Sequence, residues 1–368
     1  MSCRNYRKTP LFRWTVLAAL LAAFSLVQYR LTMPALSREH LAWLLSESGR
    51  PVEAAPLLRD EVMRDPFQPE LLYGLACCLY RSGEARKSFD YFCRAIANSK
   101  NREPLLSNAF FSLGGACMDM KEYKGAVSAY SYALEFGGPD AEALYYRGVA
   151  LDEGGELDRA VADMSASLEL LAEPEAPHTW ATRESERIVR HHLGVLFIRL
   201  GRPGEAVPLL AEAMAPDGNL PYVLYALAYA RMELGAWGPA LELFGRAAAL
   251  SPADPDIHGD ALGGRAFVLL RLGRDAEAAR VCDEALQWGE SPSLYYNRAC
   301  ANGALGRYDQ AVADCGRALA LDPDHAEAGH NRRCYAAMRA AGGHGGEGTP
   351  LAAGASGPLP PLAPAMPD

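Results

Sequence analysis

The chain has 368 residues, more than one compact hydrophobic core usually holds, which indicates two or three globular units or one elongated array. Half of the residues are hydrophobic and 22% are charged, a balance that excludes a fully disordered chain. The net charge is −9, but the first thirty residues hold five basic residues and no acid, so the remainder carries 31 basic and 45 acidic residues, a net −14. Such an acidic body is a poor match for nucleic acid or an anionic bilayer, because both need a positive surface.

The first predicted element is an uncharged apolar segment over residues 14–29, preceded by four basic residues. Sixteen helical residues at about 1.5 Å each fall slightly short of a hydrocarbon layer about 30 Å thick, and the apolar residues among 31–36 would extend the length. Three interpretations stay open: a non-cleaved signal anchor, a cleaved signal peptide and a buried helix. We predict the signal anchor because residues 28–33 offer no cleavage site with small side chains at alternate positions. The basic residues before it predict a cytoplasmic N-terminus, with the rest of the chain outside.

The next part of the chain, residues 35–323, is dominated by an internal repeat. Turn residues recur at steps of 34, 38, 34, 46, 34, 38 and 33 residues. The residue seven positions before each turn is always Ala or Gly, and the residue five positions after it is Ala or, once, Ser. The pattern therefore predicts that each repeat consists of an amphipathic helix, a tight turn and a second helix, with small residues that let the two helix axes approach. The turn residues are Gly49, Gly83, Lys121, Gly155, Gly201, Gly235, Gly273 and Gly306.

This pattern resembles the tetratricopeptide repeat (TPR), a helix-pair repeat with a period of 34 residues. Good copies are Tyr295–Pro323 and Leu113–Phe136, and the resemblance covers about residues 35–323 in eight units. It implies an all-α, right-handed superhelical solenoid of antiparallel helix pairs, in which the first helix of each pair lines the concave side. The first unit, residues 35–66, departs most from the pattern, with two prolines in its second helix region and Glu61 at a usually small position.

Three further segments complete the predicted domain organisation after the basic N-terminus and apolar helix of residues 1–34. Residues 173–186 are expected to be a loop insertion between the fourth and fifth units, because their prolines interrupt a helix. Residues 324–340 predict a C-terminal capping helix, which repeat arrays need for solubility. Residues 341–368 are rich in Gly, Pro and Ala without an apolar period, and we expect a disordered tail there.

The resemblance also implies that residues ten and six positions before each turn point into the concave groove. Ten positions before the turn, five of eight residues are Tyr or Phe. Because aromatic side chains give a large contact area at a small entropy cost, this composition suits an extended peptide with apolar side chains. The alternative is that the rings fill the space between adjacent repeats. The predicted peptide-binding residues are Tyr73, Phe111, Tyr145, His191, Tyr222, Tyr225, Tyr229, Phe267 and Tyr296.

Residue types that carry catalysis or bind metals form no recognisable motif. The nine cysteines contain no Cys-x-x-Cys spacing, and His191 and His192 are adjacent, so on a helix they point in different directions. Carboxylate pairs such as Asp152 and Glu153 are interpreted as solvated helix faces. We therefore predict that the chain is not an enzyme and has no cofactor and no metal. Unpaired thiols in this number also argue against an oxidising compartment.

The leading hypothesis is a membrane-anchored scaffold for protein–protein interaction that binds peptide segments of other proteins in the aromatic-lined groove. Its membrane contact would be residues 14–29, nucleic acid would not be a partner, and the setting would be the bacterial cell envelope, with the repeats in the periplasm. The alternative is a cytoplasmic adaptor, or a regulatory or substrate-recognition subunit of an enzyme complex. Free thiols favour this alternative, and the basic-then-apolar start disfavours it.

Overall fold

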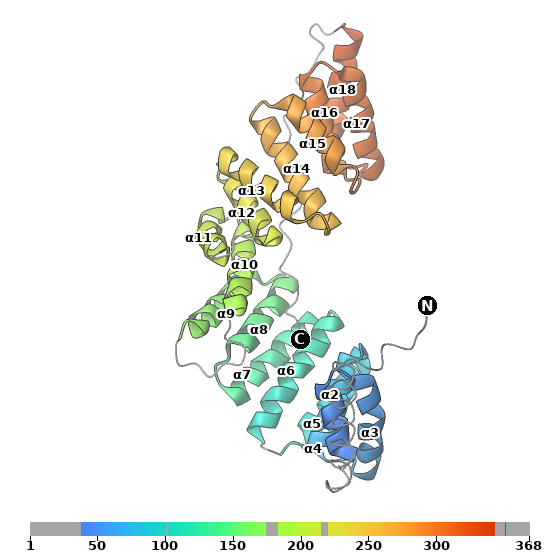
Figure 1. Cartoon of the computed structure of the whole chain (residues 1–368), viewed down its shortest axis with the longest axis vertical. Helices are drawn as coiled ribbons and strands as arrows, with labels where there is room; N and C mark the ends of the chain where they lie inside the picture. Colours follow the sequence, from blue (N-terminus) through green and yellow to red (C-terminus); the bar gives the residue numbers. More distant parts are fainter. Residues whose placement is uncertain (1–37, 101, 174–182, 215–219, 343–349, 351–368) are drawn as a thin grey trace, which may run out of the picture. The chain divides into compact units, whose positions relative to one another are not determined.

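The computed structural model describes residues 38–100, 102–173, 183–214, 220–342 and 350 (Figure 1). Within these ranges every regular element is an α-helix, and the helices follow one another as antiparallel pairs joined by short turns. The chain divides into two compact units, one ending at Pro139 and one beginning at Asp140.

The described part of the first unit consists of three helix pairs. The first helices of successive pairs contact each other, and the second helix of each pair contacts the first helix of the next pair. Each helix pair is thus stacked on the next pair along the chain. The pairs are α2 (Arg38–Glu47) with α3 (Pro51–Arg64), α4 (Pro69–Arg81) with α5 (Ala85–Asn98), and α6 (Glu103–Asp119) with α7 (Tyr123–Gly137).

The described part of the second unit consists of five pairs and a last single helix. First helices again contact first helices from α10 onward, so α10, α12, α14 and α16 form one layer. The last helix, α18 (Ala326–Ala340), packs against α17. The pairs are α8 (Ala141–Glu153) with α9 (Leu157–Leu171), α10 (Arg183–Arg199) with α11 (Pro203–Ala213), α12 (Pro221–Glu233) with α13 (Trp237–Leu250), α14 (Pro255–Arg271) with α15 (Asp275–Ala285), and α16 (Pro292–Ala304) with α17 (Tyr308–Leu321).

The turns inside the pairs have the backbone conformation that the sequence predicts. All eight predicted turn residues have positive φ: 58° at Lys121 and between 69° and 81° at the seven glycines. The residue after each turn returns a hydrogen bond to the carbonyl group five positions earlier, as Arg202 N donates to Phe197 O at 2.8 Å. This 6→1 bond satisfies a carbonyl group that the helix end leaves without a partner. The prediction of glycine-type turns is confirmed.

The small residues before the turns let the two helices of a pair approach closely, as predicted. A Cβ atom on Gly114 would lie 2.6 Å from Cε1 of Tyr130 in the second helix of the same pair. A Cβ atom on Gly194 would lie 2.6 Å from Cγ of Leu210. Since real Cβ contacts lie at ordinary van der Waals distance, larger side chains at these positions would push the helices apart.

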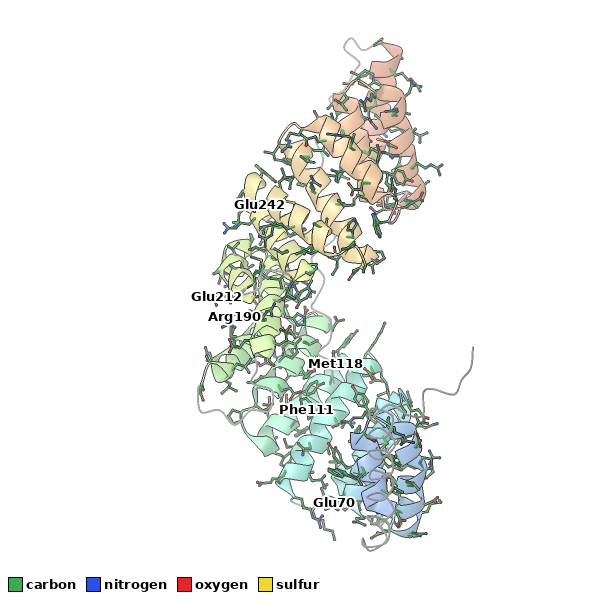
Figure 2. All side chains as sticks on the ribbon, in the orientation of Figure 1. Glu70, Phe111, Met118, Arg190, Glu212 and Glu242 are labelled. Carbon is green, nitrogen blue, oxygen red and sulfur yellow. The ribbon has the colours of Figure 1, made fainter. Side chains whose placement is uncertain are left out.

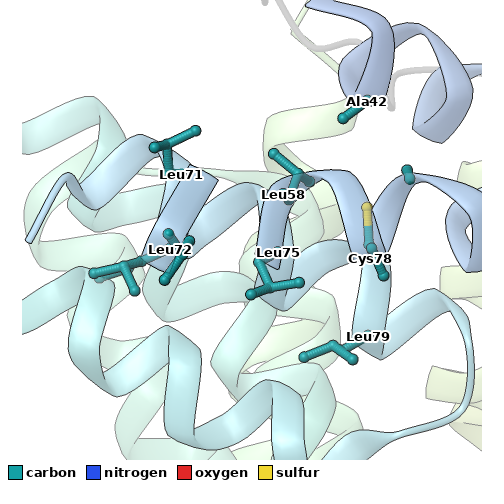
Figure 3. Close-up of a cluster of buried hydrophobic side chains, with 11 residues drawn as sticks. Ala42, Leu58, Leu71, Leu72, Leu75, Cys78 and Leu79 are labelled. Atoms are coloured by element: carbon teal, nitrogen blue, oxygen red, sulfur yellow. The ribbon is translucent and has the colours of Figure 1, made fainter. Parts of the chain in front are cut away.

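The hydrophobic core of the first unit continues from one pair to the next (Figure 3). Ala42 of α2, Leu58 of α3 and the α4 residues Leu72, Leu75 and Leu79 belong to one cluster of buried side chains. Full burial of a leucine contributes about 1.5–3 kcal/mol. The cluster therefore joins α2 and α3, which come from the first and least regular repeat, to the second pair.

The predicted localisation as a single-pass membrane protein is corrected by the structure. Among the helices that the structure describes, none is both long and apolar enough to cross a membrane. The longest of them, α6, α10 and α14, have 17 residues each, fewer than the roughly 20 apolar residues that a span requires. The predicted anchor, residues 14–29, lies outside the described residues.

Other predicted segments also fall partly or wholly outside the described residues. This applies to residues 1–34 and to the predicted tail, 341–368, apart from residues 341, 342 and 350. Of the predicted loop, residues 174–182 lie outside, and residues 183–186 are the first turn of α10.

Candidate functional site

The nine predicted peptide-binding residues differ in their exposure to solvent. Tyr73, Phe111 and Tyr222 are half-buried. The other six are buried, which agrees with the alternative that their rings fill the space between helices. Their part in peptide binding remains a prediction. Their exposed fractions are Tyr145 2%, His191 0%, Tyr225 1%, Tyr229 7%, Phe267 4% and Tyr296 0%.

In the first unit, Tyr73 and Phe111 lie on first helices and pack against second helices. The ring centroids of Tyr73 and Phe92 are 5.9 Å apart, and those of Phe111 (labelled in Figure 2) and Tyr130 are 5.5 Å apart. Tyr73 also lines a pocket of about 460 Å³ together with Trp43, Cys77 and Arg81. Burial raises the pKa of Cys77 to about 11, so its thiol stays protonated and unreactive at neutral pH.

In the second unit, two histidines connect α8, α10 and α12. The hydroxyl group of Tyr145 lies 2.9 Å from Nδ1 of His192, and the ring of His191 meets the ring of Tyr222 edge-on at 4.8 Å. Neither ring nitrogen of His191 has a hydrogen-bond partner. Burial, with a further contribution from His192, lowers the pKa of His191 well below 6.5. His191 is therefore neutral at pH 7 and packs against Tyr222.

A second pocket, of about 180 Å³, lies where the first helices of three successive pairs meet. Helices α12, α14 and α16 each contribute to its lining, as does the turn between α15 and α16. The pocket brings together three of the predicted residues, Tyr225, Tyr229 and Phe267, with others that the sequence did not single out. Among these others are Asp256, Gly259, Asp260, Gly263, Trp288, Glu290, Leu294 and Asn297.

At this pocket a glycine interrupts the column of aromatic residues on the first helices. Tyr225 of α12 and Tyr296 of α16 stand ten positions before their turns, and the equivalent residue of α14 is Gly263. A Cβ atom on Gly263 would lie 3.3 Å from Leu294, so larger side chains have little room there. One turn earlier, a Cβ atom on Gly259 would meet only Trp288, at 3.9 Å. The two glycines thus leave these two positions of α14 without side chains beside the pocket.

The charged residues that line this pocket are all acidic. Asp256 and Asp260 are four residues apart on α14 and so lie on the same side of that helix, and Glu290 comes from the following turn. Burial, followed by repulsion from Asp256 and Asp254, raises the pKa of Asp260 from 3.8 to about 6. Among the described residues that line the pocket there is no Arg, Lys or His to balance this charge.

Asn297, which also lines this pocket, has an unsatisfied hydrogen-bond acceptor. Its side chain is 4% exposed, and its Oδ1 atom has no hydrogen-bond partner. A buried amide oxygen without a partner costs roughly 1–3 kcal/mol. Native proteins retain few such groups, and each marks a place where a bound water, ion or ligand can supply the missing donor.

Charged side chains elsewhere in the second unit form ion pairs that hold helices together. Arg298 donates to both carboxylate oxygens of Asp314, at 3.0 and 2.6 Å, which joins α16 to α17. Arg190 Nε donates to Glu212 at 3.2 Å and joins α10 to α11 (Figure 2). The acidic residues of the pocket differ from these because no described Arg, Lys or His lines the pocket with them.

The sequence contained a signal for this pocket that the prediction of the peptide-binding residues missed. Residues 256, 259, 260 and 263 read Asp, Gly, Asp and Gly, and this spacing places both acids and both glycines on one face of a first helix. Trp288 and Asn297 carried no comparable signal, because their contribution depends on how the next pair stacks.

Comparison with known proteins identifies the repeats. Models of the tetratricopeptide repeat family match residues 112–173, which include α7, α8 and α9, and residues 292–325, which include α16 and α17. Residues 112–173 and 292–325 are thus tetratricopeptide repeats. A search of curated protein sequences gave no match.

Solved TPR structures support the same fold. A tetratricopeptide repeat protein from Parabacteroides merdae is 17% identical, with a TM-score of 0.53 over 73% of this chain and 98% of that one. A chain of the Cut9–Hcn1 hetero-tetramer of the APC/C is 14% identical, with a TM-score of 0.51 over 84% of this chain and 58% of that one. At these identities the likeness concerns the fold alone, and it confirms the predicted all-α solenoid of helix pairs. TPR proteins bind other proteins or peptides and are generally non-enzymatic scaffolds.

Proposed function

We propose that this chain is a non-enzymatic interaction scaffold whose second unit binds an extended peptide segment of a partner protein. The binding surface would be the layer of first helices α12, α14 and α16. The observation that carries the proposal is the pocket at their junction, because it combines aromatic walls with acidic side chains and one unsatisfied amide oxygen, that of Asn297. Ligand sites are typically concave and mostly apolar, with a few convergent polar groups that fix orientation.

The lining of the pocket suits a peptide better than a flat protein surface. Tyr229, Phe267 and Trp288 provide apolar contact, and Gly259 and Gly263 leave the backbone of α14 accessible to a bound chain. An extended peptide presents both a backbone and projecting side chains, so one side chain would enter the pocket while the backbone follows the helices.

The other predicted residues take different parts in this proposal. Tyr73, Phe111 and Tyr222 keep enough exposure for contact with a partner. Tyr145, His191 and Tyr296 would support the surface from behind. We also propose the division of residues 35–323 into eight repeats closed by a capping helix over 324–340.

Substitution of Trp288 by Ala tests the proposed surface. The Trp288 side chain is 41% exposed and touches the ring of His258, with centroids 4.4 Å apart, so its removal should leave the fold intact. Replacement of buried Tyr225 would instead open a cavity and cost about 3–5 kcal/mol. We expect Trp288→Ala to capture partner proteins from a lysate at least five-fold less well than the wild type, as measured by quantitative mass spectrometry.

The matched control is Phe67→Ala, which removes an aromatic side chain that is 71% exposed in the first unit. Capture by this variant should equal that of the wild type, and both variants should keep the wild-type helical content by circular dichroism. Undiminished capture by Trp288→Ala would refute the proposed surface, as would an equal loss in both variants.

A further inference from the structure

We infer that the pocket between α12, α14 and α16 takes the guanidinium group of an arginine side chain in the bound peptide. The inference rests on the proposed function and adds to it the chemistry that selects the partner. It follows from three observations: the sign of the charge in the pocket, the unpartnered amide oxygen and the aromatic walls.

Charge is the first observation. Asp256, Asp260 and Glu290 line the pocket, and no cation of the described residues lines it with them. Glu290 accepts a hydrogen bond from the Tyr295 hydroxyl at 2.8 Å, which leaves its second oxygen available. The raised pKa of Asp260, about 6, reflects a carboxylate that burial and neighbouring acids destabilise, and a bound cation would relieve this cost.

The helix N-termini beside the pocket do not make it an anion site. The α14 N-cap Asp254 accepts from Ile257 N at 3.2 Å, and the α16 N-cap Ser291 accepts from Leu294 N at 3.1 Å. Both helices also begin with proline, which has no N–H to offer. Each of these helix starts therefore has fewer backbone N–H groups that could hold an anion, and a capping side chain already accepts from one of them.

The acceptors and the aromatic rings favour arginine over other cations. Asn297 Oδ1 is buried and lacks a donor, and together with the carboxylates of α14 it provides acceptors from two helices. Guanidinium carries five N–H donors in one plane, so it can bond to several acceptors while its face stacks on a ring such as Trp288. Lysine offers a compact, strongly hydrated charge that matches neither feature as well.

The size of the pocket fits this group, and its geometry disfavours a bare metal ion. A volume of about 180 Å³ exceeds the ~150 Å³ of an engineered cavity that holds benzene, which is larger than guanidinium. In the described part of the chain, no group of three or more His, Cys, Asp or Glu side chains is arranged to hold a metal ion. An organic cation therefore fits the site.

Fluorescent peptide libraries with one fixed central residue test the assignment on the full chain. Each peptide has three uncharged, randomised residues on either side of Arg, Lys, citrulline or Glu, with blocked ends. Citrulline has nearly the shape of arginine but no charge. We expect fluorescence anisotropy to give an affinity for the Arg library at least ten-fold above that for the citrulline library, with the Lys library weaker than Arg by three-fold or more and the Glu library weakest.

Two variants and a control locate the effect in the pocket. Asp260→Asn should reduce the Arg preference over citrulline to three-fold or less. Gly259→Leu places a larger side chain where a Cβ atom meets only Trp288, and it should weaken binding of every library by filling the pocket. Glu242→Gln removes an exposed acid of α13 outside the pocket (Figure 2) and should leave all affinities unchanged.

The possible failures distinguish this inference from the proposed function. Equal binding of the Arg and citrulline libraries would overturn the inference while leaving a peptide-binding surface, and equal binding of the Arg and Lys libraries would overturn the choice of guanidinium. An Arg preference that survives in Asp260→Asn would place the selective charge outside this pocket. Absence of binding by all four libraries would overturn the peptide-binding function itself, and the inference with it.

Discussion

Substitution of Gly194 by Ala should separate the close approach of the two helices in a pair from the intrinsic preference of alanine for helices. The added Cβ would lie 2.6, 2.8 and 3.3 Å from Cγ, Cδ2 and Cδ1 of Leu210, which is 0% exposed and therefore confined. Overpacking of this kind costs about 1–3 kcal/mol, whereas replacing a helical glycine by alanine gains about 1 kcal/mol. The matched control is Gly245→Ala in α13, where a Cβ atom meets nothing within 4 Å, and it should show the gain alone.

A double-mutant cycle with Leu210→Ala completes the experiment. Leu210→Ala alone should cost about 2–5 kcal/mol, because it leaves a cavity in the core. In the double variant the new methyl group enters that cavity, so we expect a favourable coupling of about 1–3 kcal/mol in urea unfolding followed by far-UV circular dichroism. Additivity within about 0.5 kcal/mol, or the same stability change in Gly194→Ala and Gly245→Ala, would refute the close approach.

Two further predictions concern buried titratable groups, and both are measured from urea midpoints across pH. His191→Leu should stabilise the protein by about 1 kcal/mol at pH 7, because it removes two buried nitrogens without partners. This advantage should grow below pH 6.5, since the unfolded histidine binds a proton that the folded one resists, and wild-type stability then falls by up to about 1.4 kcal/mol per pH unit; a gain independent of pH would contradict the lowered pKa. Asp260→Asn should stabilise by about 1 kcal/mol at pH 8, an amount discounted for the partial exposure of this side chain. The folded pKa of Asp260 is raised from 3.8 to about 6, so the penalty of its charge is complete above pH 6 and disappears as the pH falls toward 3.8; an equal gain at pH 4 and pH 8 would rule out this origin.

The sequence was sufficient to predict the helix pairs because local rules determine them. Lys121 shows this best: a lysine rarely adopts positive φ, yet its place in the repeat predicted a turn, and its φ is 58°. The repeat position, more than the residue type, determined the backbone conformation. The small residues were equally predictable, because any larger side chain at Gly114 or Gly194 meets the partner helix.

The site was predictable only in part, since burial depends on what the next pair presents. Tyr225 and Tyr73 occupy the same repeat position, but Tyr225 is 1% exposed and Tyr73 is half-buried. The pocket residues Asp260 and Asn297 come from different pairs, and no local pattern reveals that Asn297 Oδ1 lacks a donor. Contacts across three pairs determine the burial and the hydrogen bonding of these side chains. The sequence periodicity within one pair therefore does not predict them.

The stacking of each pair on its immediate neighbours has a consequence for how such a chain can change over time. Whole pairs can be duplicated or deleted with repair needed at a single junction. The pocket, however, is lined by α12, α14 and α16, so it requires the three consecutive pairs from Pro221 to Leu321. Exchange of any of these three pairs would change the lining of the pocket while the stacked helix pairs remained. The binding preference is therefore far easier to lose, or to change, than the fold.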